Sequence, residues 1–427
     1  MPNYRIGTRV LAPDQPDFEA LVERAYKASL RPLCLCSGDP GSPMYIASVQ
    51  GRYILKRMPN SGGQHAMSCV SWEPPEEFSG RADVYGSGVR YEGDTVKLRV
   101  NFALSRTGGR SAPESVNRGT TKPSIKADGK QLTLLSLLHY LWDEAGLTRW
   151  PGLGGRRNWA FVYRSLLAAA ENKRVKDMDL SKVLFLPEPW SKETRDAIAA
   201  RRRERFTSIA SAEGKKAHRL LLLIAELKEI QKTGIGFRVL YFHVPDCGFA
   251  MDGGQHERMI RNFGSVMKLQ AVHDSRHTIM AATFSVSAEG APSIEELTLM
   301  ETNEQWVPFD SVYELNLMEK MIAEGRSFAR VLRYNRDSNA RMPSFLLTDH
   351  GHLPVAMNVQ DVDAGAEHQE PQLIHTDYET WTWNPRKQGE IPPLPPPEPD
   401  VQASAGHIAE PPLPPSRPAQ LLGATGL

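Results

Sequence analysis

Apolar residues recur at helical spacing in some segments of the chain and alternate with polar residues in others. Offsets of three and four place apolar side chains on one face of a helix, whereas strict alternation places them on one face of a strand. Short β-rich runs separated by a pair such as Gln50 and Gly51 indicate hairpins. In the first 105 residues these patterns predict a helix over 17–28, a hairpin of strands 44–49 and 52–57, and a second hairpin with a turn at 92–94 and a strand over 96–104.

The remainder of the chain mixes both patterns without regular alternation. Residues 106–130 are rich in Gly, Ser, Thr, Pro and charge, which predicts a linker. Asn158 stands where a helix N-cap is expected, and Ser191 where the cap of a basic helix is expected. The predicted helices cover 134–142, 159–170 and 311–322, and the predicted strands cover 183–186, 220–230, 237–244, 278–286, 297–301, 345–347 and 355–359.

This mixture favours an α+β fold over a doubly wound sheet. A chain of 427 residues exceeds what one core usually organises, so we expect several domains. Between Pro392 and Pro418, eleven of 27 residues are proline, which predicts a disordered tail. The expected divisions are a small β-rich domain at 1–105, a linker at 106–130, a helical basic region at 131–215, a mixed α+β domain at 216–385 and a proline-rich tail at 386–427.

Three of the four cysteines crowd one short region together with a histidine. The pattern is Cys34-x-Cys36, then 28 residues, then His65-x-x-x-Cys69. Three thiolates and an imidazole form the donor set of a closed, structural zinc site with no position open for catalysis. A helix beginning near Gln64 would place His65 and Cys69 on one face. The alternative is that the cysteines are buried small hydrophobes and His65 a surface residue.

These residues also bring a family resemblance into view. The resemblance covers the chain from about Tyr4 to Val359. Its motifs are Cys34-Leu35-Cys36, Met44-Tyr45-Ile46, Leu55-Lys56-Arg57-Met58-Pro59, His65, Cys69, Leu332-Arg333-Tyr334 and Leu346-Leu347-Thr348-Asp349. The sequence resembles an uncharacterised bacterial family of unknown function with three N-terminal cysteines, found in proteobacteria and often on plasmids and integrative elements. The resemblance implies a mobile-element setting and no established activity.

Charge is unevenly distributed in a chain whose net charge is only +1. Residues 149–232 carry 19 Lys and Arg against 10 Asp and Glu, whereas residues 359–427 carry 3 against 10. Phosphates attract such clusters of cations, so DNA or RNA is the expected partner. The candidate contacts are Arg156, Arg157, Lys173, Arg174, Lys176, Arg201, Arg202 and Arg205. The alternative is a solvated helix surface, because residues 201–205 fan across about 200° of a helix.

The third region permits comparison with nucleases of the restriction-endonuclease type. These use carboxylates to hold Mg²⁺ and a lysine to assist water. Glu319 lies on the predicted helix, but Ser344 and Asn358 occupy the positions where carboxylates are needed. An active site would therefore require other acids, such as Glu314, Asp349, Asp361 or Asp363.

Other features narrow the setting. No apolar stretch is long enough to span a bilayer and no secretory signal precedes the chain, so we expect a cytoplasmic protein without a membrane partner. His243, Cys247 and His256, or His273 with His277, offer only a weak second metal site. The preferred interpretation is a non-catalytic, zinc-stabilised accessory protein of a mobile element that associates with nucleic acid. The alternatives are a metal-dependent nuclease and an interaction scaffold that meets protein partners through its proline-rich tail.

Overall fold

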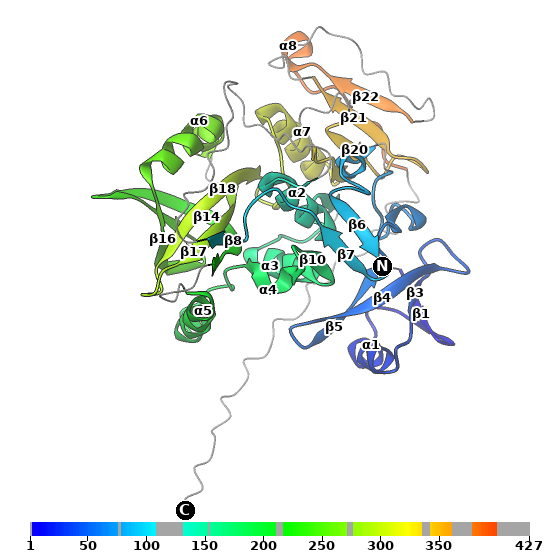
Figure 1. The fold of residues 1–427 in the computed structure, drawn as a ribbon. Coiled ribbons are helices and arrows are strands. Elements are labelled where there is room, and N and C mark those ends of the chain that lie inside the picture. The colour runs from blue at the N-terminus through cyan, green and yellow to red at the C-terminus, as the bar shows by residue number, and fades with distance from the viewer. Residues whose placement is uncertain are drawn as a thin grey trace, which may run out of the picture.

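The structure is a computed structural model, and it describes residues 2–75, 78–107, 131–152, 154–210, 217–270, 276–334, 342–360 and 378–398. Strands form several sheets, and helices pack between and against them (Figure 1). The chain is therefore a mixed α+β protein, as its sequence predicts. Residues 108–130 of the predicted linker and 399–427 of the predicted tail lie outside the described residues.

The first sheet has five strands and carries Cys34, and Cys36 lies in the turn after β3. Its elements are β1 (Tyr4–Ile6), β2 (Arg9–Leu11), β3 (Leu33–Cys34), β4 (Ser42–Val49), β5 (Arg52–Arg57) and the helix α1 (Phe18–Lys27), which packs against β5. The strand order is β2-β1-β3-β4-β5. Gln50 and Gly51 both have positive φ, the conformation of the two-residue turn that suits twisted strands. The predicted helix and the first predicted hairpin are thus confirmed.

A four-stranded sheet and three helices follow. The elements are β6 (Val89–Glu92), β7 (Thr95–Leu98), α2 (Leu134–Glu144), α3 (Trp159–Ala170), β10 (Lys173–Val175), β11 (Met178–Asp179) and α4 (Leu180–Val183). Asn158 caps α3, since its Oδ1 accepts the N–H of Phe161 at 2.9 Å. The second predicted hairpin exists, but its strand ends at Leu98, because the chain then leaves the ladder for a single bridge between Val100 and Leu132.

The next strands form a barrel. Its elements are β12 (Leu184–Phe185), α5 (Arg195–Ile209), β14 (Leu221–Thr233), β15 (Gly236–Tyr241), β16 (Val244–Met251), α6 (Gly253–Gln270), β17 (His277–Val286) and β18 (Pro292–Thr302). The predicted basic helix begins later than expected. Thr194 is its N-cap residue, and the Oγ of Ser191 accepts the N–H of Thr194 at 3.3 Å in the turn before it.

The barrel closes because β14 is long enough to pair with two different strands. Its first half, Leu221–Glu226, pairs with β17, and its second half, Leu227–Thr233, pairs with β15 across a β-bulge. β16 pairs in parallel with β18, and β18 pairs with β17. The ring therefore runs β14-β15-β16-β18-β17 and returns to β14. Its apolar interior includes Met259 and Phe263 of α6 and Phe206 of α5.

The last sheet includes one strand, β9, that comes from much earlier in the chain. Its order is β22-β21-β20-β19-β9, and α7 packs its apolar face on it. The elements are β9 (Arg149–Pro151), α7 (Val312–Ala323), β19 (Ser327–Arg330), β20 (Phe345–Leu347), β21 (Val355–Val359), β22 (Thr380–Trp383) and α8 (Pro385–Gln388). The two predicted strands 345–347 and 355–359 are confirmed to the residue.

The largest apolar cluster crosses the boundaries that the sequence analysis places between domains. The largest apolar cluster joins Val96 of the first segment, Leu138 of the second and Ile279 of the third. Arg106 and Thr107, assigned to the linker, instead form β8 (Ser105–Thr107), which pairs with β13 (Ala217–Arg219). Burial of apolar residues from every segment in common therefore fixes the segments against one another.

The prediction that the disordered tail begins at residue 386 is wrong. Residues 391–398 lie against the last sheet, where Ile391 and Leu394 pack on its apolar cluster. The carbonyl of Pro395 accepts a hydrogen bond of 2.6 Å from the buried guanidinium of Arg326. Trp381 Nε1 donates to Pro393 at 3.0 Å. Proline lacks an amide donor but keeps its carbonyl, so this segment can satisfy neighbouring donors while remaining extended.

A chain ending at Gln388 should be less stable than one ending at Glu398. The shorter chain loses two packed apolar side chains and leaves a donor of Arg326 unsatisfied, which should reduce the free energy of unfolding by about 3 kcal/mol. Urea denaturation of both truncations measures the difference. Equal midpoints and slopes would show that residues 389–398 contribute nothing.

Candidate metal centre and neighbouring sites

Cys34 and Cys36 reach the site from the middle strand of the first sheet. Cys34 ends β3, where it pairs with Tyr4 on one side and Ser42 on the other. The chain then turns back, and Gly41 adopts a φ of +86°. A Cβ at Gly41 would lie 3.0 Å from the carbonyl oxygen of Cys34, so glycine is required there.

His65 and Cys69 lie on the loop that follows β5. A single 3₁₀ turn, Gly62–Gln64, ends directly before His65, whose backbone is extended. The predicted α-helix from Gln64 is therefore wrong. Cys69 returns to His65 through a turn in which its N–H donates to the carbonyl of Ala66 at 2.8 Å. A turn, and not a helical face, therefore brings Cys69 close to His65.

The four predicted ligands converge. Their donor atoms all lie within 4.8 Å of one another. Cys69 Sγ is 3.8 Å from Cys34 Sγ and 3.8 Å from His65 Nδ1, and Cys36 Sγ is 3.4 Å from the same nitrogen. Cys34, His65 and Cys69 are buried, and Cys36 is partly exposed. This cluster could hold a metal ion.

The sulfur of Cys69 is stabilised as a thiolate. A hydrogen bond from the Cys34 thiol, helped by bonds from His65 and from the N–H of Ser71, lowers the pKa of Cys69 in spite of burial. The same hydrogen bond and burial raise the pKa of Cys34. Because the thiolate is the form that binds metals, the cluster already contains one prepared ligand.

Arg149 holds the loop that carries Cys69. Its guanidinium donates to the carbonyls of Cys69 at 2.6 Å, Val70 at 2.7 Å and Trp72 at 2.9 Å, and it lies over the Trp72 ring. Burial lowers the pKa of Arg149 to about 10, which still leaves it charged at neutral pH. Arg149 belongs to β9, so it connects the cysteine cluster to the last sheet.

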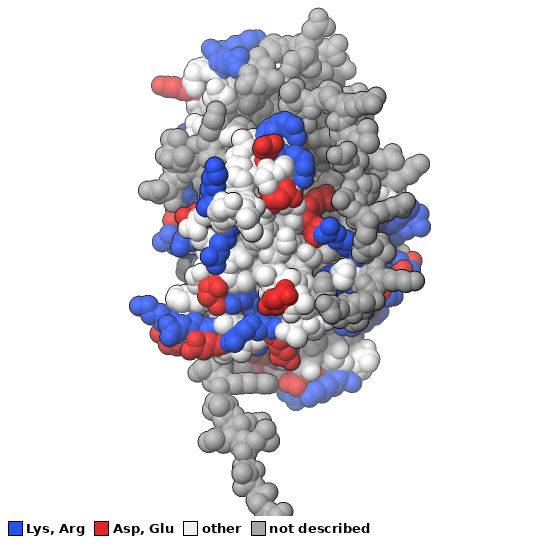
Figure 2. Space-filling view, turned by 60° about the vertical axis from the view of Figure 1, so that its left-hand side comes forward, with Lys and Arg blue, Asp and Glu red and all other residues white. Residues whose placement is uncertain are grey.

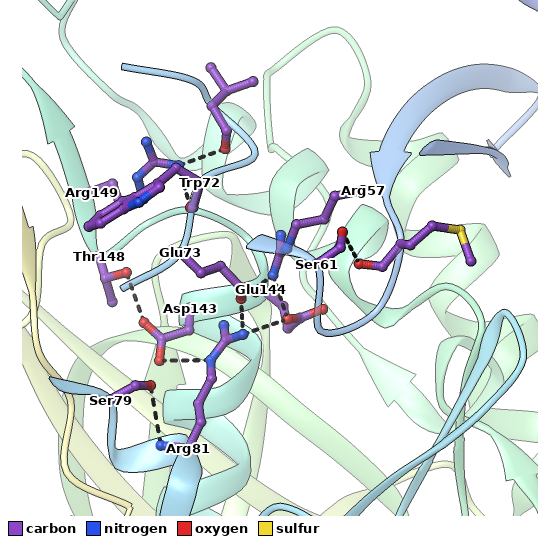
Figure 3. Close-up of polar contacts among 12 residues, drawn as sticks. Arg57, Ser61, Trp72, Glu73, Ser79, Arg81, Asp143, Glu144, Thr148 and Arg149 are labelled. Carbon is purple, nitrogen blue, oxygen red and sulfur yellow. Dashed lines mark hydrogen bonds and ion pairs between the residues drawn. The ribbon is translucent and has the colours of Figure 1, made fainter. Parts of the chain in front are cut away.

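A cluster of buried charges lies beside this loop (Figure 3). Glu144, near the end of α2, pairs with Arg57 at 2.9 Å, Arg81 at 3.1 Å and Lys173 at 2.8 Å. Glu73, four residues after Cys69, also pairs with Arg57 and Arg81. The surrounding cations hold the pKa of Glu144 well below its usual range despite burial. The loop that carries Cys69 therefore also supplies one carboxylate of this cluster.

Three of the predicted nucleic-acid contacts must be withdrawn. Arg157, Lys173 and Arg202 are 8%, 3% and 9% exposed, so they cannot present charge at a surface. The first donates to the carbonyl of Leu147 at 3.0 Å, the second pairs with Glu144, and the third pairs with Asp246 at 2.6 Å. Helical spacing and charge alone do not distinguish a buried, paired cation from an exposed one.

The other five predicted contacts have partners within the chain. Arg156 pairs with Glu304, Arg201 pairs with Glu188, Arg174 donates to the carbonyl of Asp177, Lys176 to that of Phe102 and Arg205 to that of Leu184. On the face drawn in Figure 2, the described basic and acidic side chains are interspersed rather than gathered by sign. The local charge excess is therefore not expressed as a single basic patch on that face.

The acids considered for a nuclease are engaged elsewhere. Asp349 forms a buried ion pair with Arg326 at 2.7 Å, and Glu314 pairs with Arg330 at 2.8 Å. The carbonyl of Ser344 accepts a bond from Arg330, whereas Glu319 is exposed. Asp361 and Asp363 lie outside the described residues. Among the residues that the structure describes, the Cys/His cluster is the only group of three or more potential metal ligands that meet.

The scattered histidines do not assemble into a second metal site among the described residues. His243 stacks on Trp159 at 5.4 Å between ring centroids and His256 stacks on Phe237 at 3.6 Å, so each packs against its own aromatic ring. Cys247 is half-buried on β16, and His273 lies outside the described residues. In the described part of the chain, no helix is both long and apolar enough to cross a bilayer.

The closed barrel is the feature that sequence reasoning missed. The sequence analysis predicted strands at the positions of β14, β15 and β17, but period-two alternation cannot show that the two halves of β14 pair with different strands. The length of β14, thirteen residues against six for β15, was the available signal. A strand that outlasts its hairpin partner needs a second partner for its backbone groups.

A family model matches residues 4–386 of the chain, and its description is a protein of unknown function, DUF1173. The chain therefore belongs to this family, which confirms the resemblance noted from its cysteines. No curated protein and no solved structure matches the chain.

Arg149→Met should destabilise the protein, whereas Arg156→Met should not. The first variant leaves three carbonyls of the Cys69 loop without their charged donor, at a cost of about 2–4 kcal/mol. The second removes an arginine whose side chain is 78% exposed and whose ion pair should contribute less than about 0.5 kcal/mol. Denaturant titration of both variants tests the contrast, and similar losses from both would contradict the role assigned to Arg149.

Proposed function

We propose that this member of the DUF1173 family is a zinc-stabilised protein that binds single-stranded nucleic acid without cleaving it, and that its barrel makes the contact. The observation that carries the proposal is the closure of β14-β15-β16-β18-β17 with α6 between the third and fourth strands in chain order. The OB-fold has the same connections. Its first three strands form a meander, its third strand pairs in parallel with its fifth, and its fourth strand pairs with its first.

OB-fold barrels bind oligonucleotides and oligosaccharides on the face of their second and third strands and on the adjoining loops. In this chain that face belongs to β15 and β16. Arg238 on β15 is exposed, and its side chain extends over Gly248 of β16, where a Cβ would overlap it. A flat guanidinium on this face can contact a phosphate or stack on a base.

The loop between the first and second strands adds further contacts. Ile235 at its tip is fully exposed, and Lys228 and Lys232 on the adjoining strand are exposed as well. Glu229 is the one acidic residue of the described stretch 227–241. This hairpin therefore offers cations and an apolar tip, the combination that single-stranded nucleic acids bind through backbone and base. Nucleic acid is favoured over oligosaccharide because these side chains are cationic.

Zinc is the metal we propose for the Cys/His cluster. A tetrahedral Zn²⁺ with bonds of about 2.3 Å to sulfur and 2.0–2.1 Å to nitrogen requires sulfurs about 3.8 Å apart and a nitrogen about 3.6 Å from each sulfur. Three of the six donor separations, at 3.8, 3.4 and 3.8 Å, fit that requirement, and all six lie within 4.8 Å. Cys34, Cys36, His65 and Cys69 would fill all four positions, so the ion stabilises the fold and leaves no position for substrate. An accessory role on a mobile element stays a prediction.

The purified protein should contain about one zinc per chain. Cys36→Ser and Cys69→Ser should lose it and unfold at lower temperature, because structural zinc contributes binding free energy of about 10–16 kcal/mol in small zinc domains. Elemental analysis and thermal melts measure both effects. Cys247→Ser, which changes the half-buried thiol on β16, is the matched control and should retain its zinc. Metal-free wild-type protein prepared without chelator would contradict the proposal.

The protein should bind a fluorescent single-stranded oligonucleotide with an affinity that falls steeply with salt. The triple variant Lys228→Gln, Lys232→Gln and Arg238→Gln should bind more weakly. Each lost phosphate contact reduces the slope of log K against log salt by about 0.7, so the slope should fall by about 2. Fluorescence anisotropy at four salt concentrations provides both quantities.

The matched control removes three equally exposed cations from the segment before and within α5, by Lys192→Gln, Arg195→Gln and Arg203→Gln. It should keep the wild-type slope. If this control loses affinity and the barrel variant does not, the contact belongs to the basic helical region instead. Cleavage of the oligonucleotide in Mg²⁺ or Mn²⁺ would contradict the non-catalytic assignment.

A further inference from the structure

A cavity of about 240 Å³ opens between β5, the end of α2 and the loop that follows Cys69. Its volume is close to the lower end of the range of roughly 300–1,000 Å³ that small-molecule sites occupy. Polar side chains from three separate parts of the chain surround this region (Figure 3). The cavity is distinct from the outer face of the barrel, so what it binds does not depend on nucleic-acid binding.

Cations outnumber carboxylates among the described residues of the lining. The cations are Lys56, Arg57, Arg81, Arg149 and Arg330, and the carboxylates are Glu73, Asp143 and Glu144. Arg330 is balanced by Glu314, and Arg149 is committed to the carbonyls of the Cys69 loop. Lys173 and Glu171 lie beside the lining and offset each other. Four lining cations then face three carboxylates, since the carbonyls that bind Arg149 do not neutralise its charge.

Two of these cations have donor capacity to spare. Arg57 Nε is buried and has no hydrogen-bond partner among the described residues. Lys56 Nζ donates to the carbonyl of Ala168 at 2.6 Å, and an ammonium carries three donors. Both residues are adjacent on β5, and both line the cavity. A buried donor without a partner is destabilising, so a ligand that accepts from it is favoured.

The excess charge affects Lys56 most. Burial lowers the pKa of Lys56 to about 7; the nearby cations Lys173 and Arg57 also lower it, whereas Glu144 and Glu171 raise it. The ammonium is therefore poorly compensated near neutral pH. An anion bound in the cavity would supply the missing countercharge.

We propose that this cavity binds a small oxyanion, the phosphate or carboxylate group of a soluble ligand, with Lys56 and Arg57 as its principal contacts. Arginine and lysine donors arranged around an enclosed space match the several acceptor oxygens of such a group. Glu73 and the Cys69 loop form one wall, so the metal cluster holds this wall in place. That part of the arrangement rests on the proposed zinc site.

Isothermal titration of the full chain with inorganic phosphate and, separately, with succinate tests the proposal and distinguishes the two chemistries. At least one of them should bind saturably. Lys56→Met, which keeps the length of the side chain, should weaken that binding at least tenfold. Lys97→Met, which removes an exposed lysine on β7, is the control and should bind like the wild type.

Arg57→Lys provides a second variant, because it keeps the charge but removes the Nε donor. It should weaken binding while a thermal melt shows that the fold persists, and it decides the question if Lys56→Met does not fold. Absence of saturable binding for both anions would overturn the proposal. So would equal affinity in the β5 variants and the Lys97 control. Loss of zinc without loss of anion binding would separate this site from the metal centre.

Discussion

The ionised carboxylate of Glu144 is the interaction on which most of the described structure depends. It lies at the end of the most buried helix and accepts three cations that arrive from different segments: Arg57 from the first sheet, Arg81 from a short 3₁₀ turn and Lys173 from the second sheet. A buried carboxylate without partners would take up a proton, and buried cations without it would be uncompensated. The segments must therefore assemble together, because none can bury its charge alone.

This constraint also explains why the cysteine loop has a defined position. The loop is held by the Cys/His cluster at one point, by Arg149 along its carbonyls, and by Glu73 through its pairing with Arg57 and Arg81. Gly62 lies against the Glu73 side chain so closely that a Cβ would overlap it. The Cys/His cluster is thus one of three attachments of the same loop rather than an isolated module.

The sequence predicted what depends on local pattern and short spacing. The hairpin at Gln50–Gly51, the helix cap at Asn158 and the convergence of Cys34, Cys36, His65 and Cys69 all follow from residues close in the chain. What it missed depends on distant partners. The burial of Arg202 depends on its ion pair with Asp246. The barrel closes because β14 pairs with β17, whose paired residues lie more than fifty positions later in the chain. The prolines after Gln388 suggested disorder. The carbonyl of Pro395 is instead held by Arg326, a distant donor that no local pattern reveals.

The strand that carries Arg149 has a consequence for the order in which the molecule forms. β9 pairs with β19, where Arg149 faces Ala329, so the contact spans 180 residues of chain. Closing so long a loop costs more conformational entropy than forming the hairpins of the first sheet or the meander that opens the barrel. During synthesis the cysteines leave the ribosome early, but the strand that fixes Arg149 emerges only after the whole barrel. The loop that carries Cys69 is therefore made before the barrel and secured by a strand made after it.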